Sequence, residues 1–156
     1  MLALIITSFV IVLDQASKYY TKIYLRPIGY FPVIQDVFHL TYVENRGAAF
    51  GLMQGQRWIF IVLTVLITAA IVYFLMKIPN KAVFLKTGLS LILGGAIGNL
   101  IDRVRLGFVV DMFDFTLINF PVFNIADSSL VIGSILLGYY ILFNGDLEFK
   151  KVCGLK

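Results

Sequence analysis

The 156-residue sequence contains a single cysteine, Cys153, and a single histidine, His39. One cysteine excludes an internal disulfide framework, and the two residues together are too few for a thiolate or imidazole zinc site. Charged residues make up only 14% of the sequence, against about 25% in soluble domains. The net charge of +4 is ordinary for a protein beside anionic lipid, so we expect no nucleic-acid partner. We also expect no cofactor and no metal ion.

Hydrophobic residues are abundant instead, at 60% of the sequence. A bilayer crossing needs about 20 apolar residues, and four segments are predicted to supply one, at about 2–24, 58–76, 83–101 and 125–143. The first segment lacks a basic start and a small-residue cleavage site, so we interpret it as a retained span and not as a cleaved signal peptide. The sequence therefore predicts one integral-membrane domain over 1–156, with 25–57 and 102–124 outside the lipid.

Local signals refine the third and fourth spans. Gly94 and Gly98 form a small-xxx-small step that lets another helix approach closely. Asn124 is a plausible N-cap for the fourth helix, and Asn144-Gly145 is expected to end it.

The segments outside the lipid have a different pattern. Residues Tyr30 to Ile34 and Val37 to Val43 are strand-like, and the small residues that follow Asn45 suit either strand addition by an extended peptide or a simple hairpin. Arg105 to Phe123 is too interrupted by polar residues and proline to span, and its aromatic residues suggest an interfacial helix and loop. The predicted fold class is thus a four-helix membrane protein with a small extracytoplasmic β-rich cradle and an interfacial helix or loop.

Four spans bring distant polar residues to one membrane surface. The end of the first span, the start of the second, the end of the third and the start of the fourth all face the same side. The opposite side receives a short loop with Lys77, Lys81 and Lys86 but no acid, and the positive-inside rule makes that side cytoplasmic. We therefore expect both termini in the cytoplasm. The polar residues at the extracytoplasmic surface are Asp14, Lys18, Glu44, Asn45, Arg46, Asn99, Asp102, Arg103, Asp111, Asp114 and Asp127.

Two of these aspartates, Asp111 and Asp127, are the right chemical pair for acid–base hydrolysis, provided that the fold brings them together. Ionisable groups at or near bilayer depth are expensive and usually functional. Two carboxylates close together share one proton, so that one activates water and the other polarises a carbonyl.

Five motifs resemble those of the bacterial lipoprotein signal peptidase family, signal peptidase II, in the same order. They are Asp14-Gln15-Ala16-Ser17-Lys18, Asn45-Arg46-Gly47-Ala48-Ala49-Phe50, Gly98-Asn99-Leu100-Ile101-Asp102-Arg103, Val109-Val110-Asp111 and Phe120-Pro121-Val122-Phe123-Asn124-Ile125-Ala126-Asp127-Ser128. The resemblance covers nearly the whole chain. It implies an aspartic endopeptidase of the cytoplasmic membrane that cleaves prolipoproteins on the amino side of a diacylglyceryl-modified cysteine. Its partners would be such substrates and membrane lipid, and we expect a monomer.

The resemblance also implies residue roles, with Asp111 and Asp127 as the catalytic pair and Asp114 excluded from it. Asp102 with Arg103 is interpreted as a charge pair that fixes the end of the third span. Asp14 with Lys18 is interpreted as a structural pair at the membrane surface or as a substrate contact. The full set of substrate-binding or pair-supporting candidates is Asn45, Gly47, Asn99, Asp102, Arg103, Asn124, Asp14 and Lys18.

Three other classes of protein could contain some of these residues. A serine protease lacks a base, because no lysine or histidine accompanies Ser128 or Ser129 in the motifs. A divalent-metal enzyme that uses Asp102, Asp111 and Asp127 as oxygen ligands stays open. An ion-coupled transporter or lipid-handling protein with the acids as a proton relay also stays open, although the chain has no matching halves and its acids lie at one surface.

Overall fold

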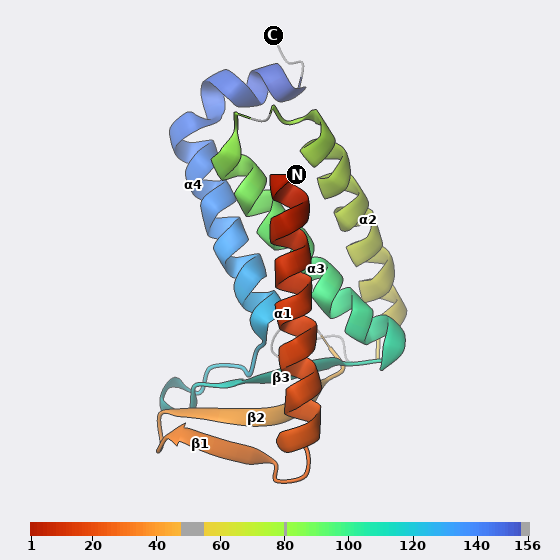
Figure 1. The fold of residues 1–156 in the computed structure, drawn as a ribbon, viewed down its shortest axis with the longest axis vertical. Coiled ribbons are helices and arrows are strands. Elements are labelled where there is room, and N and C mark those ends of the chain that lie inside the picture. The colour runs from red at the N-terminus through yellow and green to blue at the C-terminus, as the bar shows by residue number, and fades with distance from the viewer. Residues whose placement is uncertain (48–54, 80, 154–156) are drawn as a thin grey trace.

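The computed structural model describes residues 1–47, 55–79 and 81–153, with the side chains of 144–153 excluded. Within these ranges the chain forms four long helices and one small antiparallel sheet (Figure 1). The helices are α1 (Leu2–Tyr24), α2 (Arg57–Lys77), α3 (Val83–Arg105) and α4 (Ile125–Cys153). The sheet lies at one end of the helix bundle, and the last part of α4 lies at the other end.

All four helices are long and apolar enough to cross a membrane. The 21 residues of α2 rise about 32 Å at 1.5 Å each, which matches a hydrocarbon core of about 30 Å. Side chains of α2 such as Val62, Leu66 and Met76 are exposed on its surface, which suits contact with lipid. The predicted spans are thus confirmed as helices.

Two helices are longer than the sequence indicated. Helix α3 continues to Arg105, so that Asp102 and Arg103 lie in its last turns and not in a loop. Helix α4 continues through Asn144 and Gly145 to Cys153, so the expected stop there was wrong. One glycine costs a helix only about 1 kcal/mol, which is not enough to end it. Figure 1 shows the last part of α4 turning across the end of the bundle.

Helix α3 is the centre of the bundle because its glycines let α1 and α4 approach closely. A Cβ atom built on Gly94 would lie 2.8 Å from the Cβ atom of Val10 in α1, and one on Gly98 would lie 2.6 Å from Oδ2 of Asp14. One on Gly95 would collide with the backbone oxygen of Ala126 in α4. The close approach predicted for the Gly94–Gly98 step is confirmed.

The sheet has the order β1-β2-β3, with both neighbouring pairs antiparallel. Strands β1 (Tyr30–Ile34) and β2 (Phe38–Asn45) were predicted to within two residues. Strand β3 (Val109–Asp114) was not predicted, because an interfacial helix and loop were expected there. The helical part shrinks to a single 3₁₀ turn, η2 (Thr116–Ile118). The reason is that Val109 and Val110 are buried while the strand pairs with β2.

Candidate active site

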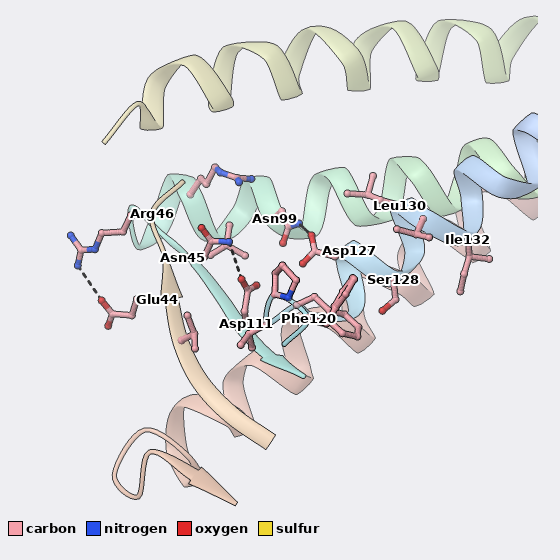
Figure 2. Close-up of a pocket in the computed structure, with 17 residues that line it drawn as sticks. Glu44, Asn45, Arg46, Asn99, Asp111, Phe120, Asp127, Ser128, Leu130 and Ile132 are labelled. Atoms are coloured by element: carbon pink, nitrogen blue, oxygen red, sulfur yellow. Dashed lines mark hydrogen bonds and ion pairs between the residues drawn. The ribbon is translucent and has the colours of Figure 1, made fainter. Parts of the chain in front are cut away.

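A pocket with a volume of about 800 Å³ lies where the sheet meets the helices. Asp111 from β3 and Asp127 from α4 both line it, and we call these two residues the aspartate pair. Figure 2 shows the side chains of Asn45, Asn99, Asp111 and Asp127 gathered at one place, with Leu130 and Ile132 farther along α4. The convergence predicted from four membrane crossings is therefore confirmed for these elements.

Asp111 is almost fully buried, with 1% of its surface exposed. Its Oδ2 accepts a hydrogen bond from Nδ2 of Asn45 at 3.0 Å, and its Oδ1 accepts one from Nδ2 of Asn124 at 2.6 Å. Burial, followed by the negative charge of Asp127, raises the pKa of Asp111 to about 7, although both amides act in the opposite direction. Asp111 is therefore poised to hold a proton near neutral pH.

Asp127 lies in the first turn of α4 and takes part in a reciprocal cap. Its backbone N–H donates to Oδ1 of Asn124 at 2.9 Å, and the backbone N–H of Asn124 donates to Oδ2 of Asp127 at 3.1 Å. This is the capping-box arrangement, with Asn124 as N-cap and an aspartate three residues later. The predicted cap is confirmed, and it fixes Asp127 as well as the helix.

Asn99 supplies the other hydrogen bond to Asp127. Its Nδ2 donates to Oδ1 of Asp127 at 2.8 Å, and its own Oδ1 accepts from Nδ2 of Asn124 at 3.1 Å. Asn124 thus contacts Asp111, Asp127 and Asn99 at once, and all four oxygens of the aspartate pair accept a hydrogen bond.

A buried ionic cluster lies beside Asn99. Nζ of Lys18 lies 2.8 Å from Oδ2 of Asp14 and 3.2 Å from Oδ2 of Asp102. Oδ1 of Asp14 also accepts the backbone N–H of Ala126 at 2.9 Å, and Oδ2 of Asp102 accepts that of Val110 at 3.1 Å. The predicted Asp14–Lys18 pair is confirmed, and both side chains are buried among the helices.

Asp102 and Arg103 were predicted to pair, but this prediction is wrong: among the described residues they form no ion pair with each other. Asp102 pairs with Lys18, whereas Nη2 of Arg103 donates to the backbone oxygen of Gly47 at 3.3 Å. The guanidinium carbon of Arg103 also lies 5.1 Å from the centre of the Phe60 ring in α2. Adjacent residues on a helix point in different directions, so the two side chains reach different neighbours.

Gly47 and Asn45 form a small turn that carries Asn45 to the pocket. The backbone N–H of Gly47 donates to Oδ1 of Asn45 at 3.0 Å, which leaves the amide nitrogen of Asn45 free to face Asp111. Arg103 therefore supports Asn45 indirectly, through Gly47. The rest of this motif, Ala48-Ala49-Phe50, lies outside the described residues.

Sequence reasoning missed several contributors. Gln15 was part of a motif but was given no role, and its Nε2 donates to Asp14, to Asp102 and to the backbone of Gly98. Its position one residue from Asp14 was the available signal. The apolar wall of the pocket was also missed, and its members are Phe120, Pro121, Val122, Phe123, Leu130, Val131 and Ile132.

The geometry also bears on the alternative chemistries. Asp114 lies outside the pocket lining and is 3.4 Å from Oγ1 of Thr41. The hydroxyls of Ser128 and Ser129 donate to backbone oxygens one turn earlier, which is a structural use. No cluster of three or more His, Cys, Asp or Glu residues in the described ranges is arranged to hold a metal ion. Asp102 pairs with Lys18, so it does not join Asp111 and Asp127 as the third oxygen ligand of the divalent-metal site considered from the sequence.

A buried carboxylate, Asp111, and a partly buried one, Asp127, lie beside one pocket at the end of four membrane-length helices. Such a pair is typical of a membrane hydrolase that works by acid–base chemistry. Residues 6–143 match the family model described as signal peptidase (SPase) II. The chain therefore belongs to the signal peptidase II family, and it is a multi-pass membrane peptidase of the aspartic type.

Individual relatives agree with this assignment. The lipoprotein signal peptidase of Caldanaerobacter subterraneus subsp. tengcongensis is 54% identical, over 94% of this chain and 100% of the relative. That of Clostridioides difficile is 51% identical, over 92% of this chain and 96% of the relative. A bacterial membrane enzyme solved by the in meso method at 2.3 Å superposes with a TM-score of 0.84 at 38% identity, covering 92% of this chain and 89% of the other. These findings favour the peptidase over the transporter.

Proposed function

We propose that Asp111 and Asp127 are the catalytic dyad with which this peptidase removes signal peptides from prolipoproteins. The observation that carries the proposal is that Asn124 holds both carboxylates beside one pocket, with hydrogen bonds of 2.6 Å to Asp111 and 3.1 Å to Asp127. The raised pKa of Asp111, about 7, lets the pair carry a single proton at neutral pH. No covalent intermediate is required.

The reaction follows from that single proton. The ionised aspartate takes a proton from water as the water oxygen attacks the scissile carbonyl. The protonated aspartate donates a hydrogen bond to the carbonyl oxygen and stabilises the charge that develops there. Collapse of the tetrahedral intermediate breaks the C–N bond, and the leaving amine receives a proton from the dyad. The products are the two peptides, and the dyad returns to its starting state.

We assign supporting roles to the eight remaining candidates. Asn45, Asn99 and Asn124 orient the dyad, and Gly47 with Arg103 positions Asn45. Asp14, Lys18 and Asp102 anchor Asn99 and the adjoining backbone.

The substrate is proposed to be cut on the amino side of a diacylglyceryl-modified cysteine. The support is the apolar wall of the pocket, which continues along α4 through Leu130, Val131 and Ile132. Val131 and Ile132 are exposed on the helix surface, so acyl chains in the membrane plane can reach them. Burying acyl chains contributes about 0.8 kcal/mol per CH₂ group, enough for the lipid to dominate recognition.

We further propose that the chain acts as a monomer, in one domain over 1–156, with the dyad near the extracytoplasmic surface and both termini in the cytoplasm. Each of the four oxygens of the aspartate pair accepts a hydrogen bond from a donor of the same chain, so the pair does not need a partner chain to hold it, which supports the monomer. The acid-free loop with Lys77 and Lys81 lies at the end of the bundle away from the sheet, which supports the orientation.

The dyad is tested by a gel-shift cleavage assay on a lipidated prolipoprotein. Asp111→Asn and Asp127→Asn should each lose at least about 10²–10⁴ in rate, because each removes a proton-transfer step. Asp114→Asn is the matched control, since it changes an acid of the same strand outside the pocket. An inactive Asp114→Asn beside an active Asp111→Asn would reverse the assignment.

The substrate and the orientation have separate tests. The same precursor with and without the diacylglyceryl group should differ sharply in cleavage by the purified enzyme in equal detergent, and equal cleavage would remove the lipid from the proposal. In a Cys153→Ser background, single cysteines at Gln35 and Leu117 should react with an impermeant thiol reagent on intact cells, whereas one at Lys81 should not. Labelling at Lys81 from outside would reverse the topology.

A further inference from the structure

Lys18 is a buried cation with every donor used. Its ammonium has three N–H groups, and three acceptors surround it, namely Oδ2 of Asp14 at 2.8 Å, Oδ2 of Asp102 at 3.2 Å and Oδ1 of Asn99 at 2.9 Å. Only 3% of its side chain is exposed. The two carboxylates already outnumber this single positive charge, so the third bond, to Asn99, calls for a separate explanation.

The bond to Asn99 fixes the direction of the Asn99 amide. An ammonium group only donates, so the atom that faces it must be the carbonyl oxygen of Asn99. Nδ2 of Asn124 donates to the same oxygen at 3.1 Å. The NH₂ group of Asn99 is therefore left facing Asp127, where it donates to Oδ1 at 2.8 Å.

The surroundings of the two aspartates differ in how well they stabilise a negative charge. Both receive two hydrogen bonds, but only Asp127 lies in the first turn of a helix, where the backbone dipole favours negative charge. Among the described residues, Asp127 is joined to Lys18 through one side chain, Asn99, whereas Asp111 reaches Lys18 only through Asn124 and Asn99 in series. The charge of Lys18 also acts on Asp111, but not through a direct donor of that carboxylate. Asp111 lies on a strand, which has no comparable dipole.

We propose that Lys18 is a positioning residue that, through Asn99, keeps Asp127 as the ionised member of the dyad, so that Asp127 is the general base and Asp111 the general acid. This inference rests on the proposed dyad and adds the direction of proton transfer to it. The charged groups that act on Asp127 are Lys18 and Asp14 from α1, Arg103 from α3 and Asp111 from β3.

The test is the pH dependence of kcat and KM for cleavage of a lipidated prolipoprotein in detergent. Lys18→Met keeps the unbranched apolar part of the side chain, one atom shorter, but removes its charge and its donors. It should lower kcat about 10- to 100-fold, the range for a lost hydrogen bond to a charged group, with KM little changed. The low-pH limb of the profile, which reports the base, should move to higher pH by about one unit or more.

Gln15→Met is the matched control because Gln15 binds Asp14 and Asp102 in the same cluster but does not contact Asn99. It should lower the thermal midpoint while leaving the low-pH limb in place. Asn99→Leu leaves the Lys18 ion pairs intact and should reproduce both the kcat loss and the movement of the limb. The Lys18→Met/Asn99→Leu double variant should be no slower than Asn99→Leu alone, since both changes cut one path.

A folded Lys18→Met enzyme with the wild-type low-pH limb, or rate losses that multiply in the double variant, would overturn the inference. If Lys18→Met does not fold, Asn99→Leu decides the question, and an unmoved limb in that variant also overturns it. These failures are distinct from failure of the proposed function, in which Asp111→Asn or Asp127→Asn would retain activity.

Discussion

Asn45 offers a direct way to change the proton affinity of the dyad from outside the helix bundle. Burial and the charge of Asp127 raise the pKa of Asp111 to about 7, while the hydrogen bonds from Asn45 and Asn124 act to lower it. The bond from Nδ2 of Asn45 to Oδ2 of Asp111 is 3.0 Å long. Asn45→Leu removes this donor while keeping the number and branching of the side-chain heavy atoms, so the pKa of Asp111 should rise further.

The magnitude follows from the type of bond that is lost. A hydrogen bond to a charged group contributes about 1.5–3 kcal/mol, and about 1.4 kcal/mol corresponds to one pKa unit. If protonated Asp111 is the acid, activity falls as pH rises through its pKa. The high-pH limb of kcat should therefore move to higher pH by about one to two units in Asn45→Leu. The ratio of kcat at pH 8 to kcat at pH 6 should increase.

The assay is cleavage of a lipidated prolipoprotein in detergent, with kcat and KM measured across the pH range. Thr41→Val is the control, because it removes a donor on the same strand whose partner is Asp114 and not the dyad. Asn45 could instead bind the substrate backbone, and then KM would rise while the limb stayed in place. A limb that stays in place or moves to lower pH refutes the reasoning about Asp111.

Two further outcomes concern stability. The pKa of Asp111 is about 7 in the folded protein and near 3.8 ordinarily, so the folded state binds this proton more tightly and loses stability as pH rises through that range. The thermal midpoint in detergent should therefore fall as pH rises from about 4 to about 7. This fall should largely disappear in Asp111→Asn, and an equal fall in both proteins would contradict the cause given. Gly98→Ala places a Cβ atom 2.6 Å from Oδ2 of Asp14 and should lower the midpoint by several degrees. Gly138→Ala, with no atom within 4 Å, should not lower it, and equal midpoints for the two variants would argue against close packing at Gly98.

The sequence alone was sufficient to locate the four helices and two strands, because each carries its own signal in composition or in flanking residues, but it did not give the ends of α3 and α4. The third strand was not predictable in this way. Val109–Asp114 is short, and it becomes a strand by pairing with β2, more than 60 residues earlier. Its aromatic neighbours in 115–123 dominated the local pattern and favoured an interfacial helix. Long-range pairing of this kind has no local signature.

In the candidate site, too, contacts between neighbours in the sequence were predictable and long-range contacts were not. The N-cap at Asn124 was predictable because it depends on neighbours only three residues away. The partner of Asp102 was not, since adjacency to Arg103 suggested a pair that helix geometry separates. Buried polar groups find partners wherever the packed helices offer them, and Lys18 on α1 was not identifiable from the sequence as that partner.

At the start of α4, the same side chains stabilise the helix and hold the dyad. The first backbone N–H groups of a helix have no partner within it. Here Asp14 accepts from Ala126, and Asn124 accepts from Asp127. The same two side chains hold Lys18 and Asp111. Loss of the Asp14 or the Asn124 side chain therefore removes a cap of α4 and disturbs the dyad at the same time.

Asn45 is different because it approaches Asp111 from a strand and caps no helix. Its loss leaves the helix start and the ionic cluster intact, so the change in proton affinity can be measured on a folded enzyme. Substitutions on the sheet side of the pocket should therefore alter the pH profile with little loss of stability, whereas those at Asp14 and Asn124 should alter both. When the thermal midpoint of each variant is plotted against the displacement of its pH limb, the two groups of variants should separate. If all variants instead fall on one line, then every change in the proton affinity of the dyad is accompanied by a loss of stability, and the distinction between the two sides of the pocket is wrong.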